Sequence, residues 1–171
     1  MTRLNRILAL ALTLVLMLGA VVGVVSSAAY DAEGYILATN VAYDDAIAPM
    51  FAISKEKVAS VSGLTVTVDG VDATYVGTTE NLFNTSDKDI EEGTAEPVAA
   101  HIFKAAGIAP KLLDEDLEVV VSVNGEAVAT FTYNVALDYF QAKLDAGATG
   151  NKKALYEAVL VYAAAAKAQF G

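Results

Sequence analysis

The chain has 171 residues, no cysteine and a formal net charge of −10. An acidic surface repels nucleic acid and anionic lipid, so we exclude a nucleic-acid-binding protein. The absence of cysteine excludes disulfides, thiol catalysis and cysteine-ligated zinc, so the fold must be stabilised by its core alone.

The N-terminal segment, residues 1–29, has the layout of a secretory signal peptide. Arg3 and Arg6 give it a positive start, and residues 7–25 are all apolar, Gly or Thr. Small residues follow and provide a cleavage site after Ala29. The apolar run is also close to the ~20 residues that span a bilayer, so an uncleaved membrane anchor is the alternative. In both cases we expect a protein that is secreted or displayed at the cell surface.

Residues 30–171 are long enough for a single domain with a proper core. Both arginines precede this region and every acidic residue lies within it, which supports the predicted boundary. No internal repeat or linker divides it. We interpret the excess of acidic residues as a means of solubility outside the cell. The alternative interpretation is that these residues bind cations.

Two strands are predicted at the start of the domain, at 34–43 and 46–53, because turn residues Asp44-Asp45 separate two apolar stretches. A short polar link follows at 54–61, for which a helical turn is the alternative.

A hairpin is predicted at 64–75, where two alternating segments flank Asp69-Gly70, a pair typical of two-residue turns. Such a turn sets Val68 opposite Val71 and Leu64 opposite Tyr75. The apolar side chains then share one face, and threonines and an aspartate occupy the other, as in a sheet with one buried side.

The middle of the chain is less regular. Residues 78–96 are polar and acidic, and we expect a long exposed loop there. Another strand is predicted at 98–106, followed by a connection at 107–116.

A second hairpin is predicted at 117–133, around Asn124-Gly125. A simple two-residue turn would point Phe131 away from the valine face of the facing strand. A one-residue bulge at the glycine shifts the register by one and sets Leu117 opposite Phe131, so we expect the bulge.

The hydrophobic period changes after this hairpin and predicts helices. Asn134 is expected to cap a helix at 135–144, with Leu137 and Phe140 on its buried face. Asn151 is expected to cap a second helix that ends near residue 169. The apolar stripe of this second helix comprises Leu155, Val159, Tyr162, Ala166 and Phe170.

The C-terminal part of the chain resembles a module of exported modular proteins from anaerobic Gram-positive bacteria. The resemblance lies in residues 132–140 (TYNVALDYF) and 153–171, where a last strand leads to a short helix and a final helix ends in Gln-Phe-Gly. Residues 107–117 and the opening strands at 34–53 also fit. The resemblance implies a β-sandwich with a helical tail in an envelope or extracellular setting, and it implies no catalytic residue.

Candidate catalytic residues are few. His101 is the sole histidine and lies in the strand predicted at 98–106. No second histidine or glutamate stands at metal-ligand spacing, and no Gly-x-Ser-x-Gly elbow occurs. We therefore expect a half-buried strand histidine, no catalytic or metal-binding residue and no cofactor.

Two weaker signals concern ligands. Tyr35, Tyr43 and Tyr75 are the candidate ligand-binding residues, because exposed tyrosines on a sheet can form a platform for a sugar; core positions are the alternative. The acidic stretches 86–93 and 114–116 suggest weak Ca²⁺ binding, although neither has the spacing of an EF-hand loop.

The expected fold is mainly β: an antiparallel sandwich of about six or seven strands with one or two C-terminal helices. An α+β arrangement, in which helices cover an antiparallel sheet, is the alternative. The expected function is that of a non-catalytic binding or adhesion module. Its partner would be a cell-wall or extracellular glycan or an envelope protein, and it would meet the membrane only through an uncleaved N-terminal segment. A structural protein that works through protein–protein contacts is the second hypothesis.

Overall fold

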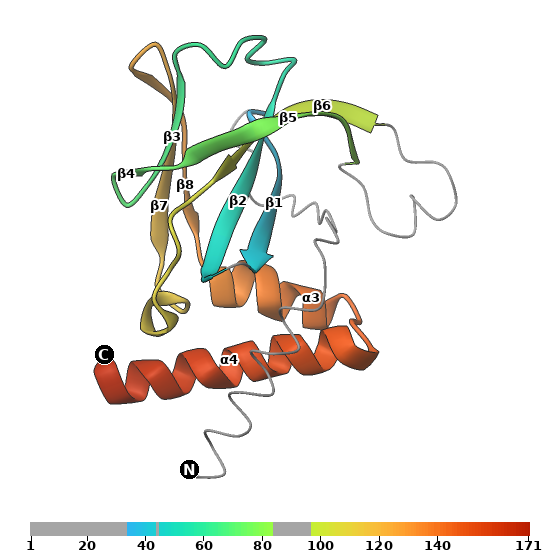
Figure 1. The fold of residues 1–171 in the computed structure, drawn as a ribbon, viewed down its shortest axis with the longest axis vertical. Helices are drawn as coiled ribbons and strands as arrows, with labels where there is room; N and C mark the ends of the chain where they lie inside the picture. The colour runs from blue at the N-terminus through green and yellow to red at the C-terminus, as the bar shows by residue number, and fades with distance from the viewer. Residues whose placement is uncertain (1–33, 44, 84–96) are drawn as a thin grey trace.

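The computed structural model describes residues 34–43, 45–83 and 97–171. In these residues two antiparallel four-stranded sheets face each other, and helices close one end of the pair (Figure 1). The predicted mainly β fold with a helical tail is therefore confirmed, with eight strands in the described part of the chain. The predicted signal segment and the acidic run 86–93 lie outside the described residues.

The first sheet has the strand order β1-β2-β6-β5. Its strands are β1 (Ile36–Tyr43), β2 (Ile47–Ser54), β6 (Pro97–Lys104) and β5 (Thr74–Phe83). Three of them were predicted, but the expectation of a loop from residue 78 onward is wrong, because β5 continues to Phe83. A strand at the edge of a sheet tolerates polar residues, so the polar sequence of β5 resembled that of a loop.

The second sheet has the strand order β4-β3-β7-β8. Its strands are β4 (Val71–Asp72), β3 (Leu64–Val68), β7 (Leu117–Val123) and β8 (Glu126–Tyr133). All four lie within the two predicted hairpins.

The first hairpin begins as predicted and then changes sheets. Asp69 and Gly70 have φ values of 49° and 75°, as a two-residue turn requires, and Val68 pairs with Val71. From Thr74 onward the chain belongs to the other sheet, where Tyr75 pairs with Phe103 of β6. The predicted Leu64–Tyr75 pair is therefore wrong, because Tyr75 pairs with β6, while β7 pairs with the opposite edge of β3.

The second hairpin contains a bulge, but not where the sequence placed it. Its turn has two residues, and Val123 pairs with Glu126. The extra residue lies in β8 at Val128, between the pairs Ser122–Ala127 and Val121–Ala129. Leu117 consequently pairs with Tyr133 and not with Phe131. A shift of β8 by one residue in either direction turns Phe131 and Tyr133 toward the core. The pattern therefore predicted that these rings face inward, but not in which direction the register shifts.

The core lies between the two sheets. The ring of Phe51 in β2 meets the rings of Phe131 and Tyr133 in β8 at centroid distances of 6.0 and 5.6 Å. Valines of β3 and β7 fill the rest of the second sheet's inner face, and Val66, Val119 and Val121 are fully buried there. Each such side chain contributes about 1.5–3 kcal/mol through burial.

The chain leaves β8 through a capped helix, as predicted. The Asn134 side chain accepts a hydrogen bond from the Leu137 backbone N–H at 3.1 Å and donates one to Asp116. The first helical segment, Val135–Gln141, is a π-helix, and α3 (Ala142–Asp145) continues it. The wider π turn buries Tyr139 and Phe140 together and leaves Leu137 exposed, so the predicted buried face is confirmed for Phe140 and wrong for Leu137.

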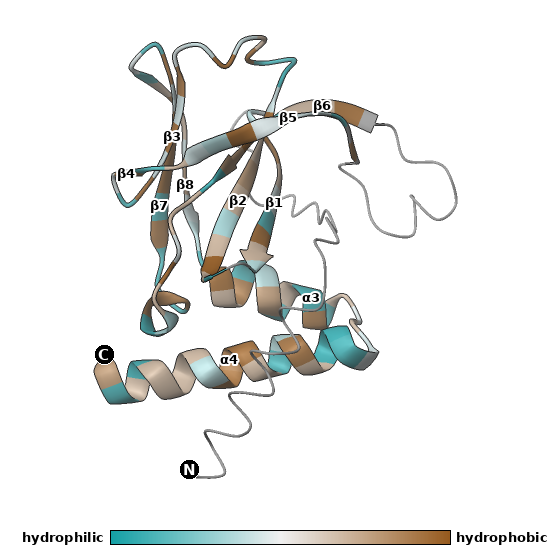
Figure 2. Ribbon diagram, viewed as in Figure 1, coloured by the Kyte–Doolittle hydropathy of each residue, from teal (hydrophilic) through white to brown (hydrophobic). Residues whose placement is uncertain are grey.

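The last helix, α4 (Gly150–Phe170), packs against η1 (Pro110–Leu112) and against the π-helix. Thr149 occupies the N-cap position, so the prediction that Asn151 caps this helix is wrong. The first turn is hydrophilic and the middle apolar (Figure 2). None of the helices in the described ranges is long and apolar enough to cross a membrane.

The predicted stripe of α4 is only partly correct. Tyr156, Ala163 and Ala166 face the domain and are buried, whereas Tyr162 and Phe170 are exposed. The alanine-rich sequence left the helix's rotation undetermined, because small apolar residues occur on every side of it.

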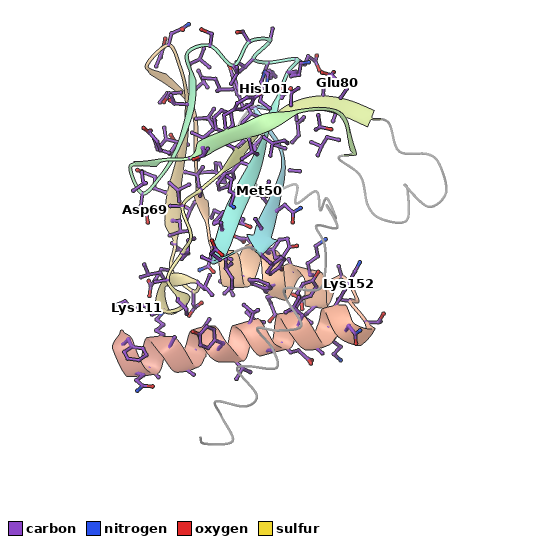
Figure 3. The ribbon with its side chains drawn as sticks, viewed as in Figure 1. Met50, Asp69, Glu80, His101, Lys111 and Lys152 are labelled. Carbon is purple, nitrogen blue, oxygen red and sulfur yellow. The ribbon has the colours of Figure 1, made fainter. Side chains whose placement is uncertain are left out.

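Polar contacts fasten the C-terminal end of α4. The Lys111 side chain donates a hydrogen bond to the Phe170 carbonyl at 2.9 Å, and Figure 3 shows Lys111 beside this end of the helix. Lys167 forms ion pairs with Glu115 at 2.9 Å and Asp114 at 3.2 Å. These contacts anchor α4 to the connection between β6 and β7.

Replacement of Asn134 by Ala is expected to lower the free energy of unfolding by about 1–2 kcal/mol, because the helix loses its N-cap. The measurement is urea unfolding followed by circular dichroism. Asn151→Ala is the matched control and is expected to change stability little, since Asn151 is exposed in α4. Equal losses in the two variants would contradict the assigned cap.

Candidate functional site

The exposed tyrosine of the first sheet is Tyr75, on the edge strand β5. Its side chain is 40% exposed. The inner part of the ring rests on β6, with centroid distances of 5.5 Å to Phe103 and 6.2 Å to His101. Tyr75 is therefore accessible, while neighbouring rings restrict its orientation.

A chain of hydrogen bonds runs inward from the Tyr75 hydroxyl. This hydroxyl lies 2.7 Å from the Thr78 hydroxyl, which lies 3.0 Å from Nδ1 of His101. Nε2 of His101 lies 3.1 Å from the Val58 carbonyl oxygen. The chain begins at the exposed edge and ends in the interior, between the first sheet and the connection that follows β2. It fixes the Tyr75 side chain at its polar end as well.

A β-bulge makes this chain possible. Residues three apart on a regular strand point to opposite faces, so Tyr75 and Thr78 would not normally meet. The register shifts between Tyr75 and Gly77, which places both side chains on the face that carries His101. Gly77 has φ 148°, a conformation that other residues rarely adopt.

Further exposed apolar side chains lie close to Tyr75 in the chain. Val71 in β4 is 57% exposed, and Val76 is exposed at the bulge. We call the exposed part of Val71–Thr78 the Tyr75 surface. Its exposed side chains include an aromatic ring, and aromatic residues are enriched at binding interfaces.

His101 lies in the interior of the sheet, between β2 and β5 (Figure 3). It is buried and not half-buried as predicted, and both of its ring nitrogens contact protein groups, Thr78 and the Val58 carbonyl. Within the described ranges, no group of three or more His, Cys, Asp or Glu residues could hold a metal ion.

The other two candidate tyrosines lie elsewhere. Tyr35 immediately precedes β1, is half-buried and has the Lys57 ammonium group 5.9 Å from its ring centroid. Tyr43 ends β1, and its hydroxyl is buried where the sheet meets the helices. The structure therefore does not bring the three candidates together, and Tyr75 is the one with an exposed, fixed ring.

Tyr43 belongs to an aromatic cluster that joins β1 to the helical tail. Its ring meets Phe140 at 6.1 Å, and Tyr139 meets Tyr156 of α4 at 6.1 Å. Burial, followed by the influence of neighbouring phenols, raises the pKa of Tyr43 and Tyr139 above the ordinary value of 10.0. The cluster stabilises the sheet–helix junction as long as its phenols stay neutral.

The acidic stretch 114–116 makes contacts within the protein. Asp114 and Glu115 pair with Lys167, and Asp116 accepts a hydrogen bond from the Asn134 side chain at 3.1 Å. Hydrogen bonds to Glu115 and Asp114 raise the pKa of Lys167. The stretch therefore fastens the helices, and its three carboxylates do not form a group that could hold the predicted Ca²⁺.

No family model, curated protein or solved structure matches this chain. The resemblance to modules of exported proteins stays an expectation from the sequence.

The tyrosine cluster predicts a loss of stability in alkali. Below about pH 10 the phenols are neutral in both states, whereas above it the unfolded chain releases protons that the folded cluster retains. Each such phenol then lowers the free energy of unfolding by roughly 1.4 kcal/mol per pH unit. Tyr139→Phe should make this decline shallower, as measured by urea unfolding between pH 9 and about 11.

Tyr162→Phe, at an exposed position of α4, is the matched control and should leave the decline unchanged. The same slope in wild type and in Tyr139→Phe would show that the cluster does not couple folding to pH.

Proposed function

We propose that the protein is an exported, non-catalytic binding module that contacts a neutral glycan through the Tyr75 surface, at the cell envelope or outside the cell. The observation that carries this proposal is an exposed aromatic ring held by Phe103, His101 and Thr78. A ring that is already ordered loses little conformational entropy when a ligand packs on it. The proposal of export rests on the sequence of residues 1–29.

The state of His101 supports a role without catalysis. A general base needs a ring nitrogen that can reach the substrate. Both nitrogens of His101 are engaged by Thr78 and by the Val58 carbonyl, and the side chain is buried. A role in holding Tyr75 accounts for these contacts.

The chemistry of the surface favours a sugar. A sugar ring offers C–H groups to an aromatic face and hydroxyls around its rim, and the Tyr75 hydroxyl has the hydroxyl of the exposed Thr78 beside it. The net charge of −10 disfavours anionic polymers. A neutral polysaccharide is therefore the best match.

Tyr75→Ala is expected to weaken retention on insoluble β-glucan by about tenfold or more, because the ring supplies the centre of the contact. The measurement is a depletion isotherm with increasing amounts of β-glucan. Tyr162→Ala is the matched control, since Tyr162 is similarly exposed but lies on α4. Unchanged retention in Tyr75→Ala, or no retention of the wild type, would contradict this assignment.

A second candidate function, assembly with further copies of the chain, rests on α4. Val161 is 71% and Phe170 is 64% exposed on this helix, although its opposite side is buried against the domain. Residues 158–166 contain no charged side chain. A helix that is apolar all round is normally covered on all sides.

The pattern of the exposed side favours another α4 as the occupant. One row of exposed residues on α4 has intervals of four and three, as in the seam of paired helices, and comprises Ala154, Ala158, Val161, Ala165 and Ala168. The only acidic residue of α4 is Glu157, against three lysines. Contact through α4 would therefore bring together the least acidic part of each chain, so charge repulsion between the two copies would be small.

Val161→Glu is expected to lower the self-association constant at least tenfold, because it places a charge in the centre of the seam. Sedimentation equilibrium over a range of protein concentrations measures it. Val71→Glu introduces the same change at another exposed valine and should leave association unchanged. A wild type that stays monomeric at its highest soluble concentration would exclude the assembly function.

A further inference from the structure

The positions of the hydrogens in the Tyr75 chain follow from its inner end. The Val58 carbonyl oxygen can only accept a hydrogen bond, so Nε2 of His101, 3.1 Å away, must carry a hydrogen. In a neutral imidazole the other nitrogen, Nδ1, then has none and can only accept. The backbone thereby selects one tautomer of His101.

The remaining hydrogens are then assigned one after the other. Nδ1 accepts the only hydrogen of the Thr78 hydroxyl, at 3.0 Å. Thr78 has no second hydrogen to donate, so it accepts from the Tyr75 hydroxyl at 2.7 Å. The single hydroxyl hydrogen of Tyr75 therefore points inward, and only oxygen lone pairs face solvent.

We propose that Thr78 and His101 are positioning residues that make the exposed Tyr75 hydroxyl a dedicated hydrogen-bond acceptor. The ligand group that meets this oxygen must then be a donor, such as a free sugar hydroxyl. An ether or carbonyl oxygen at the same place would face an acceptor and lose the bond. This inference rests on the proposed glycan function, and it adds which chemical group the Tyr75 surface selects.

The arrangement also explains why a histidine occupies this buried position. A side chain that accepts from Thr78 at one end and donates to a backbone carbonyl at the other needs both properties on one rigid ring, and neutral histidine has them. The bulge between Tyr75 and Gly77 brings Thr78 to the same face as Tyr75, so the part of the chain from Tyr75 to His101 can form within β5 and β6.

The first test is spectroscopic and needs no ligand. His101 is the sole histidine, so a long-range ¹H–¹⁵N spectrum of the uniformly ¹⁵N-labelled protein reports this ring alone. We expect the neutral form with hydrogen on Nε2 and none on Nδ1. The opposite tautomer, or a doubly protonated ring at neutral pH, would overturn the proposal.

The second test measures selectivity with soluble β-glucan and its O-methylated derivative. Wild type is expected to prefer the unmethylated glucan by about threefold to tenfold, the contribution of one hydrogen bond. Thr78→Val removes the hydroxyl that orients Tyr75 and should abolish this preference, while Thr78→Ser should restore it. Circular dichroism shows whether each variant folds, and a misfolded Thr78→Val leaves the spectroscopic test decisive.

The two proposals fail in different ways. If Tyr75→Ala binds β-glucan as wild type does, the glycan function at this surface is wrong. If Tyr75→Ala loses binding but Thr78→Val keeps the wild-type preference for free hydroxyls, the function stands and the positioning role of Thr78 and His101 is wrong.

Discussion

The domain depends on aromatic packing around Phe51 between its two sheets. Phe51 of β2 meets Phe131 and Tyr133 of β8, with the rings arranged edge to face. Since the chain contains no cysteine, packing of this kind must hold the sheets together. A register of β8 that turned Phe131 and Tyr133 outward would leave Phe51 without these ring contacts. The bulge at Val128 keeps both rings inward.

The candidate site is connected to the same aromatic packing. Phe103 pairs with Phe51 across neighbouring strands and supports the ring of Tyr75, so the aromatic contacts continue from the core to the edge of the sheet. The sequence could indicate Tyr75 as a candidate, because an aromatic residue in a strand either packs in the core or lies exposed, where it can contact a ligand. It could not indicate Thr78, because the bulge at Gly77 breaks the alternation by which faces are predicted.

Local features of the fold, such as caps and turns, could be predicted from the sequence, whereas the pairing of distant strands could not. The cap at Asn134 and the turn at Asp69-Gly70 depend on a few neighbouring residues, and both were predicted correctly. The sheet change after β4 depends on the pairing of β5 with β6, which begins only at Pro97, in place of continued pairing with its neighbour β3. The rotation of α4 was also undetermined, because alanines on all its sides give the hydrophobic period little contrast.

The interleaved order of the strands has a consequence for synthesis. The first sheet uses β1, β2, β5 and β6, all of which precede residue 105, whereas β3 needs β7. A growing chain thus exposes the apolar side chains of Leu64–Val68 on the ribosome long before their partner strand exists. Such non-local pairing slows folding and favours aggregation of the incomplete chain. Until Tyr133 has emerged, Phe51 lacks its contact in the second sheet and the apolar face of the first sheet is not fully covered.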